Sequence, residues 1–296
     1  AMVDAGGGLF EAVPSGETDD DRDLVLGEIA LLAEVSRNTG APVSFLLVQS
    51  RGAPDLWAEQ LEAVRRENEN GANLVPQIGG RPGGMLIGVA TYHGLMRRPT
   101  FRRLEESLSY EELLVELQKP EVRATILAEA DLPADPKRQY ESIADNMGYM
   151  FERLYVLGDP PDYEPGADRS IAGIAAATGA DPWAVLYDSI ASGALLLGAF
   201  TNYANGSEDH LREMLEDPTT VLGLSDGGAH VKFICDASLP TYLLTHWVRD
   251  RSRGERLSLE SAVQKQTSAT AAIVGLDDRG TLEVGKRADL NVIDFE

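Results

Sequence analysis

The 296-residue chain has a single cysteine, four histidines and five lysines, and it has no long apolar run. One cysteine, Cys235, excludes a framework of disulfides within the chain. No stretch reaches the roughly 18 uncharged apolar residues that a membrane-spanning helix needs. The N-terminus also lacks the basic and then apolar pattern of a signal peptide. These absences predict a soluble, cytoplasmic protein.

Positive charge is also scarce. The chain has 48 acidic against 26 basic residues, a formal charge of −22. A surface this negative repels nucleic-acid phosphates and anionic lipids, so we expect neither nucleic acid nor a membrane as a partner. A small-molecule substrate is the partner class that remains.

The first 80 residues alternate between strand-like apolar runs and segments with helical spacing. Such alternation is typical of a parallel sheet with helical crossovers, which places the chain in the α/β class. The expected strands are Gly7–Pro14, Ala41–Ser50 and Ala72–Gly80, and the expected helices are Asp19–Gly40 and Pro54–Asn70.

The middle of the chain, about residues 80–193, is predicted to be mostly helical, and strands and helices alternate again after it. Ser258 is the expected N-cap of the last helix. The tail, "GTLEVGKRADLNVID", predicts two short β segments around a Gly-Lys turn. The later expected elements are strands Ala194–Phe200 and Thr219–Asp226 and helices Ser207–Leu215, Leu239–Arg251 and Ser258–Ile273.

The segment "VLGLSDGGAHVK" contains a G-x-S-x-G pattern centred on Ser225. This pattern is typical of a serine nucleophile in a sharp turn between a strand and a helix. The residues after Gly227 do not resemble the first turn of a helix, and only His230 and His246 follow the serine. A serine hydrolase is therefore the third of the functions considered.

Asp226 follows the same expected strand, at the edge where α/β enzymes place their chemistry. It can be a metal ligand and general base, or it can merely cap a turn. The four histidines form no H-x-H or H-x-x-x-H pair, so the sequence shows no complete metal site.

Three segments together resemble the amidohydrolase superfamily, and most closely its D-aminoacylase or N-acyl-D-amino-acid deacylase group. They are "GLSDGGAH", "LSLESAVQKQTSATAAIVGL" and "DRGTLEVGKRADLNVIDFE". The resemblance implies a partial (β/α)8 TIM-type barrel over residues 1–275, with a helical insertion at about 80–193. Residues 276–296 would begin a small C-terminal β-sandwich.

The resemblance also implies a reaction. One zinc-like divalent ion would activate a water that attacks an amide carbonyl, and Asp226 would be metal ligand and general base. The expected substrates are N-acyl-D-amino acids or related amides, whose C–N bond is not a peptide bond.

The chain departs from the family pattern at two neighbouring strands, and the first of them, "GLFEAVPS", has no histidine. "PVSFLLVQS" has Leu47 where the family has a histidine, and Gln49 where it has a lysine. We therefore expect a one-metal or altered site, and a catalytically silent or binding protein on the same scaffold is the alternative. The start at Ala1-Met2 predicts a piece of a longer protein that is inactive alone. Its open strand edge near Gly7 favours a homo-oligomer.

Four further residues are candidates for binding the substrate. Arg81 in "QIGGRPGG" can pair with a carboxylate, although an ordinary glycine-rich loop is the simpler interpretation. His230 can orient Asp226 or contact substrate, and Lys232 can bind a carboxylate. Tyr203 follows a strand and can line the pocket, whereas a core tyrosine is the simpler interpretation.

Overall fold

The computed structural model divides the chain into two compact units, which are described separately below. Unit 1 consists of Ala1–Pro82, Thr201–Ser225 and Asp236–Glu296, and unit 2 consists of Gly83–Phe200 and Asp226–Cys235. The structure describes residues 8–15, 21–138, 141–204, 206–223, 227–228, 234 and 236–295. No helix in these ranges is both long and apolar enough to cross a bilayer.

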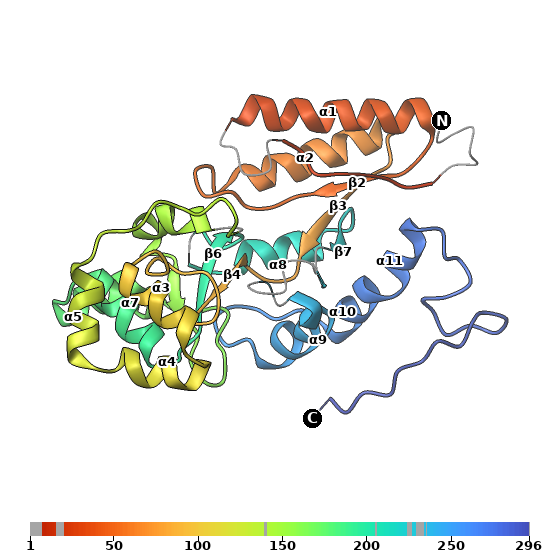
Figure 1. The fold of residues 1–296 in the computed structure, drawn as a ribbon. Helices are drawn as coiled ribbons and strands as arrows, with labels where there is room; N and C mark the ends of the chain where they lie inside the picture. The colour runs from red at the N-terminus through yellow and green to blue at the C-terminus, as the bar shows by residue number, and fades with distance from the viewer. Residues whose placement is uncertain are drawn as a thin grey trace. The chain divides into compact units, whose positions relative to one another are not determined.

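Unit 1 contains a four-stranded parallel sheet with the order β1-β2-β3-β7. Its strands are β1 (Phe10–Ala12), β2 (Val43–Leu46), β3 (Leu74–Gly79) and β7 (Val221–Gly223). Helices α1 (Arg22–Thr39) and α2 (Leu56–Glu69) lie side by side next to β2 and β3, as Figure 1 shows. The first three strands and two helices thus confirm the expected alternation.

Buried and partly exposed residues alternate along β3, so one face of the sheet is buried. In β3, Leu74, Pro76 and Ile78 are buried, whereas the residues between them are partly exposed. Leu74 and Ile78 pack in one core with residues of α1 and α2. Helix α1 begins after Asp21, whose side chain accepts hydrogen bonds from two backbone N–H groups, and ends at Gly40 with a φ of 68°. Both caps are those expected for its ends.

Of the remaining helices of unit 1, one precedes β7 and the others follow it. The predicted helix 239–251 is a short α-helix that continues as a π-helix, and the predicted helix 258–273 is interrupted at Thr267 (φ −124°, ψ −90°). Ser258 is confirmed as an N-cap, since its hydroxyl accepts from Ser261 N at 3.0 Å. The elements are α8 (Asp209–Glu216), α9 (Leu239–Tyr242), the π-helix η4 (Leu243–Asp250), α10 (Leu259–Gln266) and α11 (Ser268–Ile273).

Unit 2 has a three-stranded sheet with the order β4-β6-β5, packed with short helices. Its strands are β4 (Gly83–Ile87), β5 (Leu154–Val156) and β6 (Leu196–Thr201), and β5 is antiparallel to β6. The prediction that 80–193 is mostly helical therefore missed two strands. The helices are α3 (Pro99–Ser107), α4 (Tyr110–Leu117), α5 (Pro120–Ala128), α6 (Ile171–Thr178) and α7 (Pro182–Ala191), with 3-10 turns at Glu141–Met150 and Ala167–Arg169.

The predicted β segments of the tail are wrong for the residues described. Between residues 276 and 295 the backbone forms turns and irregular segments but no strand. The Gly-Lys turn is present, with Gly285 at a φ of 95° and Lys286 N donating to Glu283 O at 3.1 Å. Leu282, Val284 and Val292 remain exposed. A two-stranded ribbon with no packed face is only marginally stable, which explains the absence of a ladder.

The α/β class and the parallel sheet agree with the sequence analysis. In a (β/α)8 barrel each strand lies next to its neighbours in the chain. Here β7 pairs with β3, which is not its neighbour in the chain, and β5 is antiparallel to β6, whereas barrel strands are parallel. The barrel and the domain boundary at 275 therefore remain predictions.

Candidate functional site

Most of the predicted site falls where the structure gives no description. Ser225, Asp226, His230, Lys232 and Cys235 all lie outside the described residues. Their roles remain predictions. The structure describes Arg81 and Tyr203.

Arg81 and Tyr203 are both buried within unit 1. Arg81 follows β3 and is 7% exposed, and Tyr203 follows β6 and is 5% exposed. The Tyr203 hydroxyl accepts a hydrogen bond from Arg253 Nη1 at 3.2 Å. This environment agrees with the simpler interpretation of Tyr203 as a core tyrosine, and a substrate contact of either residue remains a prediction.

The end of β2 provides no metal ligand. Leu47 is 1% exposed and belongs to the core shared with α1 and α2. Gln49 is fully buried, and its side-chain amide is used in two hydrogen bonds, from Ala204 N to Oε1 (2.9 Å) and from Nε2 to Pro54 O (3.1 Å). The two residues that depart from the family pattern therefore have structural roles: Leu47 packs in the core, and Gln49 bonds backbone groups.

A carboxylate–imidazole pair lies elsewhere in unit 1. His246 Nε2 lies 2.9 Å from Glu208 Oε2, and the Glu208 side chain is fully buried whereas that of His246 is 15% exposed. Glu208 ends the stretch between β6 and α8, and His246 belongs to the π-helix η4. Because a carboxylate only accepts, Nε2 carries the proton when the two are hydrogen-bonded.

Aromatic rings fix the orientation of His246. The Tyr242 ring stacks on it at 4.6 Å with an interplanar angle of 7°, and the Trp247 ring contacts it edge-on at 5.4 Å. Trp247 is itself fixed, because its Nε1 donates to Gly80 O at 2.6 Å. Gly80 directly follows β3, so this bond ties η4 to the carboxyl end of that strand. π-helical turns are frequent at functional sites.

His210, two residues after Glu208 in the chain, has a different environment from His246. It is 8% exposed, and its Nε2 has no hydrogen-bond partner among the described residues. Burial lowers the pKa of His210 to about 4, although a hydrogen bond to the Asn202 backbone and the nearby Asp209 act in the opposite direction. His210 is therefore neutral at pH 7 and is unsuited to proton transfer there.

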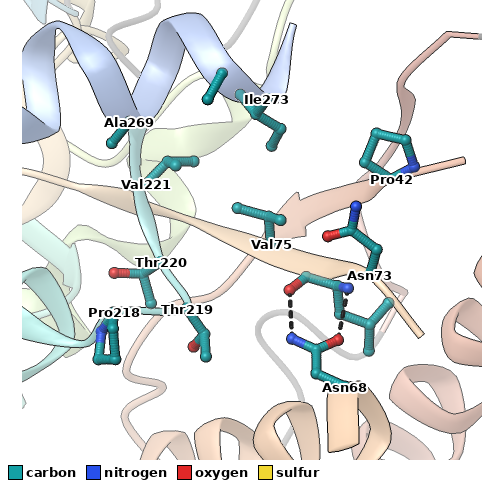
Figure 2. A pocket seen from close by; sticks show the side chains of 12 residues that line it. Pro42, Asn68, Asn73, Val75, Pro218, Thr219, Thr220, Val221, Ala269 and Ile273 are labelled. Atoms are coloured by element: carbon teal, nitrogen blue, oxygen red, sulfur yellow. Dashed lines mark hydrogen bonds between the residues drawn. The ribbon is translucent and has the colours of Figure 1, made fainter. Parts of the chain in front are cut away.

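A cavity of about 460 Å³ lies at the amino ends of the strands, away from the carboxyl end of β3. Figure 2 shows its lining near the amino ends of β3 and β7, including Val75 and Val221. The side-chain amide of Asn68 bonds both backbone groups of Leu74 there. In open parallel α/β sheets, ligands bind beyond the carboxyl ends of the strands. This cavity is therefore not the candidate active site.

The pair can bind a divalent ion only if His246 Nε2 gives up the proton that it shares with Glu208. A neutral imidazole nitrogen and a carboxylate oxygen are both ligands that zinc takes in proteins. Leu47 and Gln49 do not fit such an ion. Unit 1 thus has a parallel sheet with a buried carboxylate–imidazole pair, and the described residues directly after β1, β2 and β3 include no histidine, cysteine or carboxylate.

These features are those of an α/β protein with a buried polar pair formed between a loop and a helix. Comparison with known families is more specific, because the model of the amidohydrolase family matches residues 1–296. The chain belongs to the amidohydrolase family.

Individual relatives are similar over only part of the chain. Uncharacterized proteins of Mycobacterium bovis and Mycobacterium tuberculosis are 35% identical over 96 residues, which cover 32% of this chain and 15% of each relative. The matched region is thus a small part of those longer proteins. No solved structure matches the chain.

Sequence reasoning missed the Glu208–His246 pair. The two residues are 38 positions apart, and neither belongs to a short motif. The search for H-x-H and H-x-x-x-H pairs tests only histidines close in the chain. A helix containing His246 was predicted, but its position beside Glu208 depends on tertiary packing.

Proposed function

We propose that the chain belongs to a metal-dependent hydrolase that cleaves C–N amide bonds other than peptide bonds, with N-acyl-D-amino acids as the substrate class. The observation on which this rests is the match of the amidohydrolase family model to residues 1–296. The two segments "GLSDGGAH" and "GTLEVGKRADL" support the narrower substrate class by resemblance.

In this proposal the divalent ion, when bound, lowers the pKa of a water and polarises the amide carbonyl. Asp226 takes the proton of the attacking water and passes it to the leaving nitrogen, so that the acid and the amine separate. Within unit 1, Glu208 Oε2 and, once it has lost its proton, His246 Nε2 are donor atoms of the type that zinc takes. Gln49 takes no part in binding the ion, because its amide is already hydrogen-bonded.

Metal analysis and hydrolysis assays test the proposal. We expect the whole protein that contains this chain to retain about one equivalent of zinc, and a chelator to abolish its release of acid from N-acyl-D-amino acids, whereas the chain alone should be inactive. Asp226→Asn should lower turnover by at least about a hundredfold, as expected when a general base is lost. Ser225→Ala should leave turnover unchanged, and a large loss in that variant would favour the serine hydrolase instead.

A second candidate is a catalytically silent protein on the same scaffold. It is favoured by the end of β2, where Leu47 and Gln49 stand in place of the histidine and lysine of the family pattern. Absence of bound transition metal, together with no hydrolysis of either D- or L-configured substrates, would support this candidate over the hydrolase.

A further inference from the structure

The stretch of residues 202–208, here called the β6–α8 loop, ends at Glu208. Its described residues have little regular structure, yet Glu208 is placed within 2.9 Å of His246. Something other than a helix or strand must therefore fix the loop.

Gln49 binds the beginning of this loop with both backbone and side chain. Its backbone N donates to Asn202 Oδ1 at 2.8 Å, and its backbone O accepts from Asn202 N at 3.1 Å. Its Oε1 accepts from Ala204 N at 2.9 Å, and its Nε2 donates to Pro54 O at 3.1 Å. Gln49 and Asn202 are 0% and 2% exposed, so these bonds form away from water, where each is costly to lose.

Asn202 itself adopts a conformation that few residues favour. Its φ is 59°, the only positive φ among the described residues other than glycine. Asparagine tolerates this left-handed region better than most residues. The conformation turns the chain directly after β6 while the side chain reaches Gln49, and the Asn202 backbone also bonds His210 in α8.

The rest of the loop is held by two arginines of unit 1. Arg253 Nη1 and Nη2 donate to the Tyr203 hydroxyl and to Gly206 O, at 3.2 and 2.9 Å. Arg251 Nη2 donates to Asp209 Oδ1 at 2.7 Å, just beyond Glu208. These contacts fix the middle and the end of the loop, whereas its first turn depends on Gln49 and Asn202.

We propose that Gln49 and Asn202 are positioning residues that place Glu208 against His246. The amide at the end of β2, where the family pattern has a lysine, fixes a loop instead of binding an ion. The significance of this placement for catalysis rests on the proposed function, but the placement itself does not.

The test measures the surroundings of the His246 ring without substrate. The ring nitrogens are labelled with 15N in the full chain, and the Nε2 signal of His246 is assigned from its loss in His246→Asn. Glu208→Gln gives the shift expected when the carboxylate is absent. We expect Gln49→Met and Asn202→Ala to move the Nε2 signal toward its position in Glu208→Gln, because the loop no longer holds Glu208 in place.

Three controls separate positioning from general damage. Asn202→Asp keeps the acceptor oxygen and should give the original Nε2 signal. Asn202→Gly adopts the positive φ without strain but lacks the acceptor oxygen, so its Nε2 signal should differ from the original. Gln60→Met makes the same exchange at another buried glutamine of unit 1, in α2, and should leave the signal unchanged.

An unchanged Nε2 signal in folded Gln49→Met and Asn202→Gly would overturn the proposal. If Gln49→Met does not fold, the comparison of Asn202→Gly with Asn202→Asp decides. Because no metal or substrate is needed, a negative hydrolysis assay leaves this result unaffected.

Discussion

His210 and His246 show how surroundings decide what a histidine can do. Both lie in unit 1, but His246 Nε2 contacts the Glu208 carboxylate at 2.9 Å, whereas the His210 ring is buried with one nitrogen lacking a described partner. A nearby carboxylate favours a protonated imidazole in general, and burial disfavours it. At His210 burial outweighs the effect of the nearby Asp209 carboxylate and keeps the ring neutral at pH 7.

At this scale we predict that His210 makes the fold sensitive to acid. Its pKa of about 4 lies below the ordinary value of 6.5, so the unfolded chain binds the proton more tightly than the folded chain. The stability from the neutral ring is complete above pH 6.5 and is lost as the pH falls toward 4. The loss amounts to roughly 3 kcal/mol. Urea unfolding of the protein and of His210→Gln, followed from pH 7 to pH 4, measures it.

The variant should lose less stability than the natural sequence over this range. Parallel curves for the two proteins would show that His210 does not bind its proton differently in the folded and unfolded states.

At the scale of elements, a buried lysine joins α10 to the start of β7. Lys265 Nζ donates to Asp217 O, Thr220 O and Thr220 Oγ1 at 2.7, 2.6 and 3.0 Å. Arg65 also forms an ion pair with the Asp217 side chain. The turn before β7 is thus bound by helices from both the beginning and the end of the chain.

We predict that Lys265 affects stability at alkaline pH. Burial lowers its pKa from 10.5 to about 8, with Asp217 acting weakly against this shift. Between these values the folded chain has lost the proton while the unfolded chain retains it, so this contribution to stability rises with pH. The rise is up to roughly 3 kcal/mol between pH 8 and pH 10.5.

Unfolding midpoints of the protein and of Lys265→Met over this range test the prediction, with the exposed Lys119→Met as the control. The free energy of unfolding of the natural sequence, minus that of Lys265→Met, should rise with pH. A constant difference would contradict the lowered pKa.

The elements differ in how well sequence predicts them. The apolar run of β2 and the capped, periodic pattern of α1 are local signals, and both elements were predicted. Strand β4 was missed because its glycines resemble a loop; a Cβ on Gly84 would clash with the carbonyl of Gly198, so glycine permits close strand packing there. The π-helical turn around His246 has no comparable local signal.

At the scale of the whole molecule, the candidate site was the least predictable part. The sequence resemblance identified the amidohydrolase family, which the family match confirms. The Glu208–His246 pair, by contrast, depends on Gln49 and on Asn202, residues about 150 positions apart. Such long-range hydrogen bonds leave no periodicity in the sequence, so only the folded structure reveals them.

The two units have separate hydrophobic cores, which predicts two unfolding transitions. Ile78 of β3 belongs to the core of unit 1, and Leu117 of α4 belongs to the core of unit 2; they are 0% and 1% exposed. Replacing such a side chain by alanine typically costs about 2–5 kcal/mol, because it leaves a cavity. Domains with their own cores can unfold separately. Ile78→Ala should therefore lower one calorimetric transition by roughly 5–15 °C, and Leu117→Ala the other. A single transition that both variants lower equally would instead show that the two cores unfold as one cooperative unit.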